Sequence, residues 1–225
     1  MGYMWKVDQI LALFAPFDCL ACKKEGLLLC RECQKHVPLA PGVCYSCLSP
    51  TPTALCARCC SRVMLHSAWS ATTYQGVSRQ LVGRLKFSRT QAAAVIIAHI
   101  ITQRLPALPA DSVVVHVPTA NQRVRQRGYD QAQLIARELA RLQQLPYQAL
   151  LRRYGNSRQV GANKSERRQQ LRYAYYCPHP ERVAGKNILL IDDVLTTGAT
   201  LEAAATTLRR NEAKTISAVV FAQKI

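Results

Sequence analysis

Residues 187–206 constrain the fold more than any other part of the chain, because an apolar run leads directly into two adjacent carboxylates and a turn of threonine and glycine. The segment reads NILLIDDVLTTGATLEAAAT. The apolar run predicts a buried strand over about 187–191, and the alanine-rich residues from Ala199 to Arg210 predict a helix. A strand joined to a helix through so short a turn is typical of α/β proteins.

Similar patterns occur elsewhere in the chain. Further strands are predicted at about 69–74, 112–117 and 215–222, and further helices at about 78–87, 90–105 and 129–142. This alternation predicts a mostly parallel sheet with helices on both faces, and ligands of such sheets bind beyond the carboxyl ends of the strands. The apolar stretch 10–17 is shorter than a membrane span and is not followed by a small-residue cleavage site, so we expect a short helix there.

The turn after the acids has the composition of a phosphate-binding site. Backbone N–H groups at the start of a helix have no partner within the helix, and the helix dipole adds positive potential. A glycine lets the backbone approach an anion closely, and threonine hydroxyls add donors. The residues that make up this predicted anion site are Thr196, Thr197, Gly198, Ala199 and Thr200.

The two acids, Asp192 and Asp193, occupy the last predicted positions of the strand and should point to opposite faces. A carboxylate beside a phosphate is repulsive unless it binds something else, and vicinal sugar hydroxyls are suitable donors. The stretch therefore predicts a site for a ribose 5-phosphate.

Two alternatives remain for the same residues. An apolar run that ends in two acids also resembles a Walker B strand, but that interpretation requires a G-x-x-x-x-G-K-[ST] loop, which the sequence lacks. The acids and threonines are also common where a helix merely begins, in which case they would bind nothing.

Eight of the ten cysteines form four C-x-x-C pairs near the start of the chain. The pairs are Cys19/Cys22, Cys30/Cys33, Cys44/Cys47 and Cys56/Cys59. Such pairs suit tetrahedral zinc, and four of them predict one or two structural zinc ions fully ligated by thiolate. Sequential and interleaved combinations of the pairs both fit the spacing.

The chain is strongly basic, with 30 Lys and Arg against 13 Asp and Glu and a net charge of +17. Residues 121–175 hold 12 of the basic residues, three acids and several tyrosines, which is the composition of a path for single-stranded nucleic acid. The alternatives are a solvated helix face with tyrosines in the core and, for the charge as a whole, simple solubility.

The segment IDDVLTTGAT at 191–200 resembles the phosphoribosyl pyrophosphate (PRPP) signature of type I phosphoribosyltransferases. Together with the cysteine pairs, LKFSRT at 85–90 and RGYDQA at 127–132, it makes nearly the whole chain resemble the ComF (ComFC) family. The fold implied is a type I phosphoribosyltransferase-like parallel sheet flanked by helices over 63–225, preceded by a helix and a small zinc-ribbon module over 1–62.

The resemblance also assigns roles to individual residues. Asp192 and Asp193 would contact the ribose hydroxyls, and the turn 196–200 would hold the 5-phosphate of PRPP, which binds with magnesium. The turn 119–128 would take the place of the pyrophosphate loop. Further candidates for the same pocket are Arg123, Arg127 and Lys86, and a closing loop would contain Arg158, Gln159 and Arg167.

Proteins of this family are cytoplasmic and are associated with natural transformation. The resemblance implies handling of incoming single-stranded DNA near DNA-uptake and recombination-mediator proteins at the inner membrane, by a chain without a transmembrane segment of its own. The alternative is an active phosphoribosyltransferase of nucleotide metabolism that joins PRPP to a base or amine and releases pyrophosphate. No residue set in the sequence identifies that acceptor.

Overall fold

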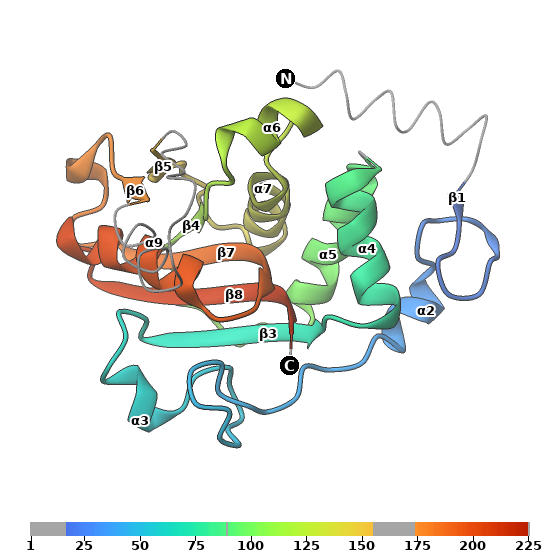
Figure 1. Ribbon diagram of the computed structural model, residues 1–225, viewed down its shortest axis with the longest axis horizontal. Coiled ribbons are helices and arrows are strands. Elements are labelled where there is room, and N and C mark those ends of the chain that lie inside the picture. Colours follow the sequence, from blue (N-terminus) through green and yellow to red (C-terminus); the bar gives the residue numbers. More distant parts are fainter. Residues whose placement is uncertain (1–16, 89, 155–173, 225) are drawn as a thin grey trace, which may run out of the picture.

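Four parallel strands form the central sheet of the protein (Figure 1). The computed structural model describes residues 17–88, 90–154 and 174–224, so the helix predicted near the N-terminus and the closing-loop residues Arg158, Gln159 and Arg167 lie outside the described residues. The strands are β3 (Ser67–Thr73), β8 (Thr215–Gln223), β7 (Asn187–Leu195) and β4 (Ser112–His116), in that order across the sheet. The predicted parallel sheet is confirmed.

Helices cover both faces of this sheet and form two cores. The helices α4 (Gly76–Phe87), α5 (Ala92–Thr102) and α7 (Gln131–Gln143) pack on one face, and α9 (Ala199–Arg210) packs on the other. Along β7, Leu189 and Ile191 join the first core, whereas Ile188 and Leu190 join the second. Because both faces of β7 are buried there, residues 188–191 form an uninterrupted apolar run.

The remaining elements are short. They are β1 (Phe17–Asp18), β2 (Glu25–Gly26), α2 (Arg31–Lys35), α3 (Ala57–Cys60), α6 (Asn121–Arg127), β5 (Arg152–Arg153), β6 (Tyr175–Tyr176) and the 3₁₀ helix η1 (Pro180–Arg182). No helix in these described parts of the chain is long and apolar enough to cross a membrane.

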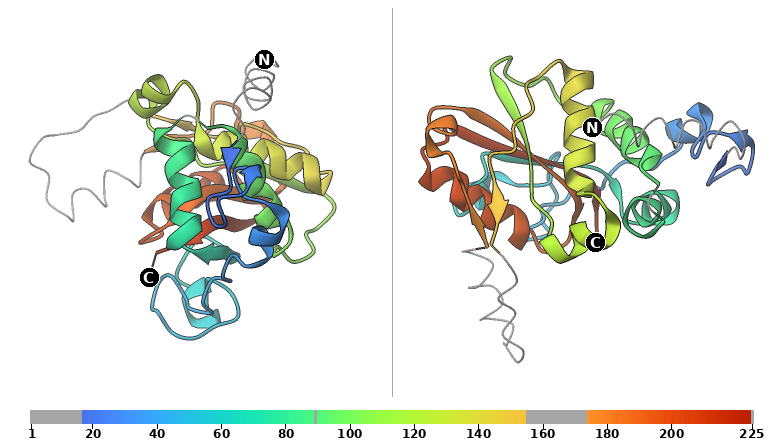
Figure 2. Two further views of the ribbon diagram at one scale, coloured as in Figure 1. Left: turned by 90° about the vertical axis from the view of Figure 1, so that its right-hand side faces the viewer. Right: turned by 90° about the horizontal axis from the view of Figure 1, so that it is seen from above.

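The cysteine-rich segment contacts both faces of the sheet. Leu28 and Leu29, from the loops of the first two cysteine pairs, join the core of α4 and α5, and Figure 2 shows these loops beside α4, far from α9. Tyr45 and Leu55, from the loops of the last two pairs, join the core of α9. The predicted boundary at residue 62, between a zinc-ribbon module and the sheet domain, stays a prediction. Each half of the cysteine-rich segment packs into a core of the sheet, so packing does not separate the two parts.

Two details differ from the sequence-based expectations. The strand β7 continues to Leu195, because pairing with β8 continues to Leu195 and Gln223, so both acids lie inside the strand. The turn predicted over 119–128 contains the helix α6, whose residues have adequate helix propensity and which ends at Gly128 with a φ of 87°. The ends of the other predicted elements differ by a few residues.

Candidate functional site

The acids of β7 face different surroundings at the carboxyl end of the sheet. Lys86, in the last turn of α4, donates a hydrogen bond of 2.8 Å from Nζ to Oδ1 of Asp193. The side chain of Asp193 is only 6% exposed, and its Oδ2 atom has no hydrogen-bond partner among the described residues. A buried carboxylate oxygen without a donor is costly, so this atom is suited to accept a hydrogen bond from a ligand hydroxyl.

Asp192 lies on the other face of the strand. Its Oδ1 atom accepts a hydrogen bond of 2.8 Å from the backbone N–H of Asp193. Burial, with a further contribution from the charge of Asp193, raises the pKa of Asp192 to about 8. The protein without ligand therefore holds Asp192 largely neutral near pH 7, and a nearby cation would favour its ionised form.

The turn between β7 and α9 presents its threonines outward. Thr196 and Thr197 are exposed, and Gly198 adopts a left-handed φ of 73° just before the first residue of α9. A side chain at Gly198 would collide with the ring of Tyr45, which comes from the cysteine-rich segment. The hydroxyl of Tyr45 also donates to Oε1 of Glu202, in the first turn of α9, over 2.7 Å.

The segment RGYDQA at 127–132 holds together the elements that surround the acids. Asp130 caps α7 by accepting from the backbone N–H of Ala132, and it also accepts from the N–H of Thr119, which follows β4 (2.7 Å). The hydroxyl of the buried Tyr129 donates to the backbone oxygen of Leu85 over 2.6 Å. Because Leu85 precedes Lys86, this bond fixes the end of α4 from which Lys86 reaches Asp193.

The structure brings only some of the predicted basic residues to the acids. Arg127 donates to Oε1 of Gln131 (2.8 Å), and its guanidinium carbon lies 5.8 Å from the ring centroid of Phe87, the neighbour of Lys86. Arg123 is exposed on α6, and no contact with either acid is found in the described part of the chain. The roles assigned to Arg123 and Arg127 in pyrophosphate binding remain predictions.

A partly buried chain of polar side chains lies beside the end of β4. The hydroxyl of Tyr147 is 2.9 Å from Nδ1 of His116 and accepts a hydrogen bond from the side chain of Gln133. Burial lowers the pKa of His116, so this residue is neutral at pH 7 and serves the core.

Sequence reasoning missed Tyr45, Glu202 and the linking roles of Tyr129 and Asp130. For Asp130 a signal existed, because an acid just before an amphipathic stretch is a common helix cap. For Tyr45 and Glu202 no local signal existed, since they lie 157 residues apart in the sequence.

The eight paired cysteines form two clusters in sequential order. The first consists of Cys19, Cys22, Cys30 and Cys33, and the second of Cys44, Cys47, Cys56 and Cys59, with the sulfurs of each within 4.8 Å of one another. The sulfur atoms of Cys22 and Cys30 are 3.8 Å apart, and those of Cys47 and Cys56 are 3.7 Å apart. Tetrahedral zinc with Zn–S bonds of about 2.3 Å places its sulfurs about 3.8 Å apart, so both clusters fit the ion.

The thiols of the second cluster titrate unequally. Hydrogen bonding to Ser49 lowers the pKa of Cys47 to about 5, whereas contact with Cys47 raises that of Cys59 to about 11. Such a split is expected of thiols crowded around one point, and a divalent cation at that point would let all four ionise. All four positions of a tetrahedral ion would be filled by thiolate, which is typical of a structural site.

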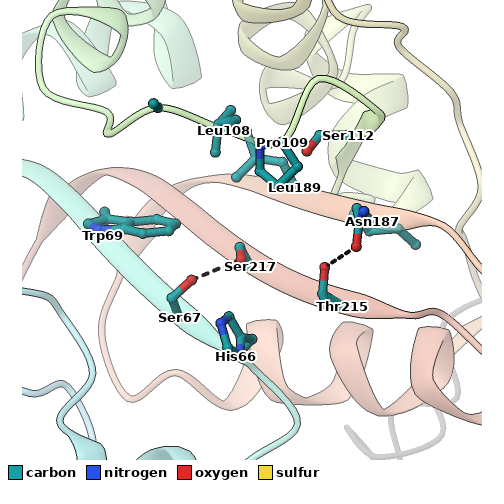
Figure 3. A pocket seen from close by; sticks show the side chains of 12 residues that line it. His66, Ser67, Trp69, Leu108, Pro109, Ser112, Asn187, Leu189, Thr215 and Ser217 are labelled. Atoms are coloured by element: carbon teal, nitrogen blue, oxygen red, sulfur yellow. Dashed lines mark hydrogen bonds between the residues drawn. The ribbon is translucent and has the colours of Figure 1, made fainter.

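The structure also has a pocket of about 320 Å³ at the opposite, amino-terminal edge of the strands. Figure 3 shows that its polar side chains face one another: the hydroxyls of Ser67 and Ser217 are 2.8 Å apart, and Thr215 donates to Asn187 over 2.6 Å. These groups are satisfied within the sheet, and the acids of β7 lie at the other edge. The pocket is therefore separate from the candidate site.

A second cavity, of about 450 Å³, lies beside β6. Its lining includes Arg152, Tyr176, His179 and Arg182. The ring of Tyr176 is 4.6 Å from that of Tyr154, centroid to centroid, and the two side chains are 37% and 57% exposed. By contrast, Tyr129 and Tyr175 are buried, so part of the predicted tyrosine set belongs to the core.

The parallel sheet, the acid pair and the turn before α9 define a phosphoribosyltransferase fold. Residues 91–225 match the family model described as the phosphoribosyl transferase domain, and the chain belongs to that family.

Relatives extend this similarity over most of the chain. The DNA utilization protein YhgH of Salmonella typhi is 28% identical over 222 residues, which cover 91% of this chain and 96% of that protein. Competence protein F of Haemophilus influenzae is 28% identical and covers 88% of this chain, with 93% of its own length matched. Competence protein ComFC of Bacillus subtilis is 27% identical over 84% of this chain and 81% of its own length. The predicted resemblance to the ComF family is confirmed.

Proposed function

We propose that this protein is a ComF-type competence protein that binds PRPP with magnesium at the β7–α9 turn and handles single-stranded DNA during natural transformation. The observation that carries the ligand part is the buried, unpartnered Oδ2 atom of Asp193, close along β7 to a turn at the start of a twelve-residue helix. In this proposal a ribose hydroxyl donates to Asp193, and the 5-phosphate accepts from the turn.

The magnesium ion would be held by the phosphates of PRPP and by the carboxylate of Asp192. The raised pKa of Asp192 fits this role, because an acid that is neutral without ligand gains its charge only when a cation arrives. Bound magnesium would neutralise the pyrophosphate, and Lys86 would hold the carboxylate of Asp193 in place through its hydrogen bond of 2.8 Å.

The DNA part rests on the cavity beside β6. Arg152 and Arg182 offer positive charge for phosphates, and the exposed ring pair of Tyr154 and Tyr176 offers a surface on which bases can stack. Two relatives are named competence proteins and a third is named a DNA utilization protein, and these names support a role with DNA. The proposal includes structural zinc in both cysteine clusters and a cytoplasmic location near the DNA-uptake and recombination-mediator proteins.

Fluorescence anisotropy of a labelled single-stranded oligonucleotide tests the DNA part. We expect salt-sensitive binding, and we expect Tyr176→Ala to weaken it by about 5- to 100-fold, the usual range for one stacked base. Arg31→Ala is the matched control, because Arg31 lies on α2 at the other end of the molecule (Figure 1). Absence of binding at low salt would remove the nucleic-acid function.

Adding PRPP and magnesium to the same titration distinguishes two arrangements. Displacement of the DNA by PRPP would mean that DNA phosphates occupy the substrate pocket itself. Binding that PRPP does not change would place DNA on the separate surface around Tyr176. Calorimetry with PRPP and magnesium, in the absence of DNA, tests the ligand part. Asp193→Asn should weaken PRPP binding by at least about tenfold, because the amide cannot replace a charged acceptor.

A second candidate function is catalysis of phosphoribosyl transfer, which the intact acid pair with its lysine favours. In that reaction the bond between C1 of the ribose and pyrophosphate breaks while a bond from C1 to a base or amine nitrogen forms. Stabilisation of the departing pyrophosphate by magnesium and arginines would supply the catalysis. Release of pyrophosphate with a panel of bases and amines, absent in Asp193→Asn, would establish this function.

A further inference from the structure

The second cysteine cluster contacts the proposed phosphate turn through one side chain. Tyr45 lies between two cysteines of that cluster, is 7% exposed and donates from its hydroxyl to Oε1 of Glu202. The other carboxylate oxygen of Glu202, Oε2, accepts from the backbone N–H of Met64 over 3.1 Å. The carboxylate at the start of α9 is therefore held on one oxygen by Tyr45, inside the cluster, and on the other by Met64, just after it.

The ring of Tyr45 packs against the turn itself. It occupies the space that a Cβ atom at Gly198 would need, and Gly198 also has a left-handed φ of 73°. Only glycine satisfies both conditions without strain. The conformation of the turn and the position of the Tyr45 ring therefore depend on each other.

We infer that Tyr45 and Glu202 are positioning residues for the β7–α9 turn, and that metal held by Cys44, Cys47, Cys56 and Cys59 fixes the turn through them. The consequence for PRPP affinity rests on the proposed function, whereas the consequence for the conformation of the turn does not.

Metal in the second cluster would add a link between the two cysteine pairs to the hydrogen bonds that already hold the Tyr45 loop. The backbone N–H of Tyr45 donates to Ala54 over 2.8 Å, and that of Cys44 donates to Ser49 over 2.9 Å. A metal ion would join the pair Cys44/Cys47 to the pair Cys56/Cys59 and so restrict the backbone on both sides of Tyr45.

The first cluster provides an internal comparison. Its loops pack against the core of α4 and α5, and among the described residues it forms no hydrogen bond with the turn 196–202. Loss of metal from the first cluster should therefore leave the turn unchanged, although both clusters have the same ligands.

Amide hydrogen exchange of the peptide that covers 196–202, measured by mass spectrometry on the full chain, tests the inference. We expect Cys47→Ser and Tyr45→Ala to raise the exchange rate of this peptide by about tenfold or more, and Tyr45→Phe to give a smaller rise, since it keeps the ring and loses one hydrogen bond to a carboxylate. Cys22→Ser, in the first cluster, and Cys60→Ser, beside the second cluster but outside it, are the matched controls and should stay within about twofold of the wild-type rate.

Unchanged exchange in both Cys47→Ser and Tyr45→Ala would overturn the inference, and so would an equal rise in Cys22→Ser. Should Cys47→Ser fail to fold, the exchange rates of Tyr45→Ala and Tyr45→Phe still test the inference, because neither variant removes a metal ligand. Calorimetry with PRPP adds a second readout, in which Tyr45→Ala weakens binding by about tenfold. A wild-type protein that does not bind PRPP would refute the proposed function, while the exchange rates would still test the link between cluster and turn.

Discussion

The ion pair between Lys86 and Asp193 leads to a quantitative prediction about stability. The two atoms are 2.8 Å apart, and the side chains are 20% and 6% exposed. Lys86→Met keeps most of the apolar stem and removes the charge, which leaves a carboxylate buried beside a second acid. Asp193→Asn removes the other charge and leaves a lysine that can still reach water.

The expected magnitude follows from this asymmetry. Removal of one partner from a fully buried pair costs about 3–5 kcal/mol, and the partial exposure of Lys86 reduces this to about 2–4 kcal/mol for Lys86→Met. Asp193→Asn should cost about 1–2 kcal/mol, because the lysine regains part of its hydration. The double variant leaves no unpaired carboxylate at position 193, so it should cost no more than Lys86→Met alone, which corresponds to a coupling of at least about 1–2 kcal/mol.

Equilibrium urea denaturation of the four proteins, with zinc in the buffer, measures this coupling. The chain offers a matched control in Lys35 and Glu32, which are also 2.8 Å apart but are 68% and 74% exposed. The coupling of that exposed pair should be close to zero, because water screens both charges. A coupling of Lys86 with Asp193 no larger than that of the control would refute the reasoning and show that the buried pair is not formed in solution.

Three further predictions concern other parts of the structure. Because the pKa of Asp192 is raised to about 8, the acid is neutral below that pH, so calorimetry should show that affinity for PRPP with magnesium increases as the pH rises toward 8, and Asp192→Asn should remove this dependence. Asp130→Ala should lower the free energy of unfolding by about 1–2 kcal/mol through loss of the α7 cap, whereas Asp130→Asn should keep most of it; an Ala variant as stable as wild type in urea would contradict the capping role. Elemental analysis should find two zinc ions per chain and one in Cys22→Ser or Cys47→Ser, and chelation should lower the melting temperature of the whole protein, because each cluster packs into a core of the sheet.

The sequence predicts those features that local patterns encode. The apolar run of β7, the acids and the glycine turn form one continuous stretch, so strand, turn and helix could be placed without tertiary information. The spacing of the cysteine pairs likewise predicts four-thiolate sites. The parallel sheet followed from the alternation of strand and helix patterns.

Features that depend on packing between distant segments could not be predicted. The order of the cysteine pairs and the attachment of the two clusters to opposite faces of the sheet depend on where Leu28, Leu29, Tyr45 and Leu55 find apolar partners. The helix α6 has no apolar stripe and none of its residues is buried, so no hydrophobic period distinguishes it from a turn. The contact of Lys86 with Asp193 joins residues 107 positions apart.

The order of the strands has a consequence for how the chain folds as it is synthesised. The strand β8 lies in the interior of the sheet between β3 and β7, and Ser67 of β3 meets Ser217 of β8 across 150 residues. In the described part of the chain, β3 pairs with no strand of the sheet other than β8, so the sheet cannot be completed until β8 has left the ribosome. The two cysteine clusters use residues between Cys19 and Cys59, all of which are made long before that. During synthesis both cysteine clusters are therefore complete before the sheet, and β8, the last of the four strands to be made, joins β3 to β7.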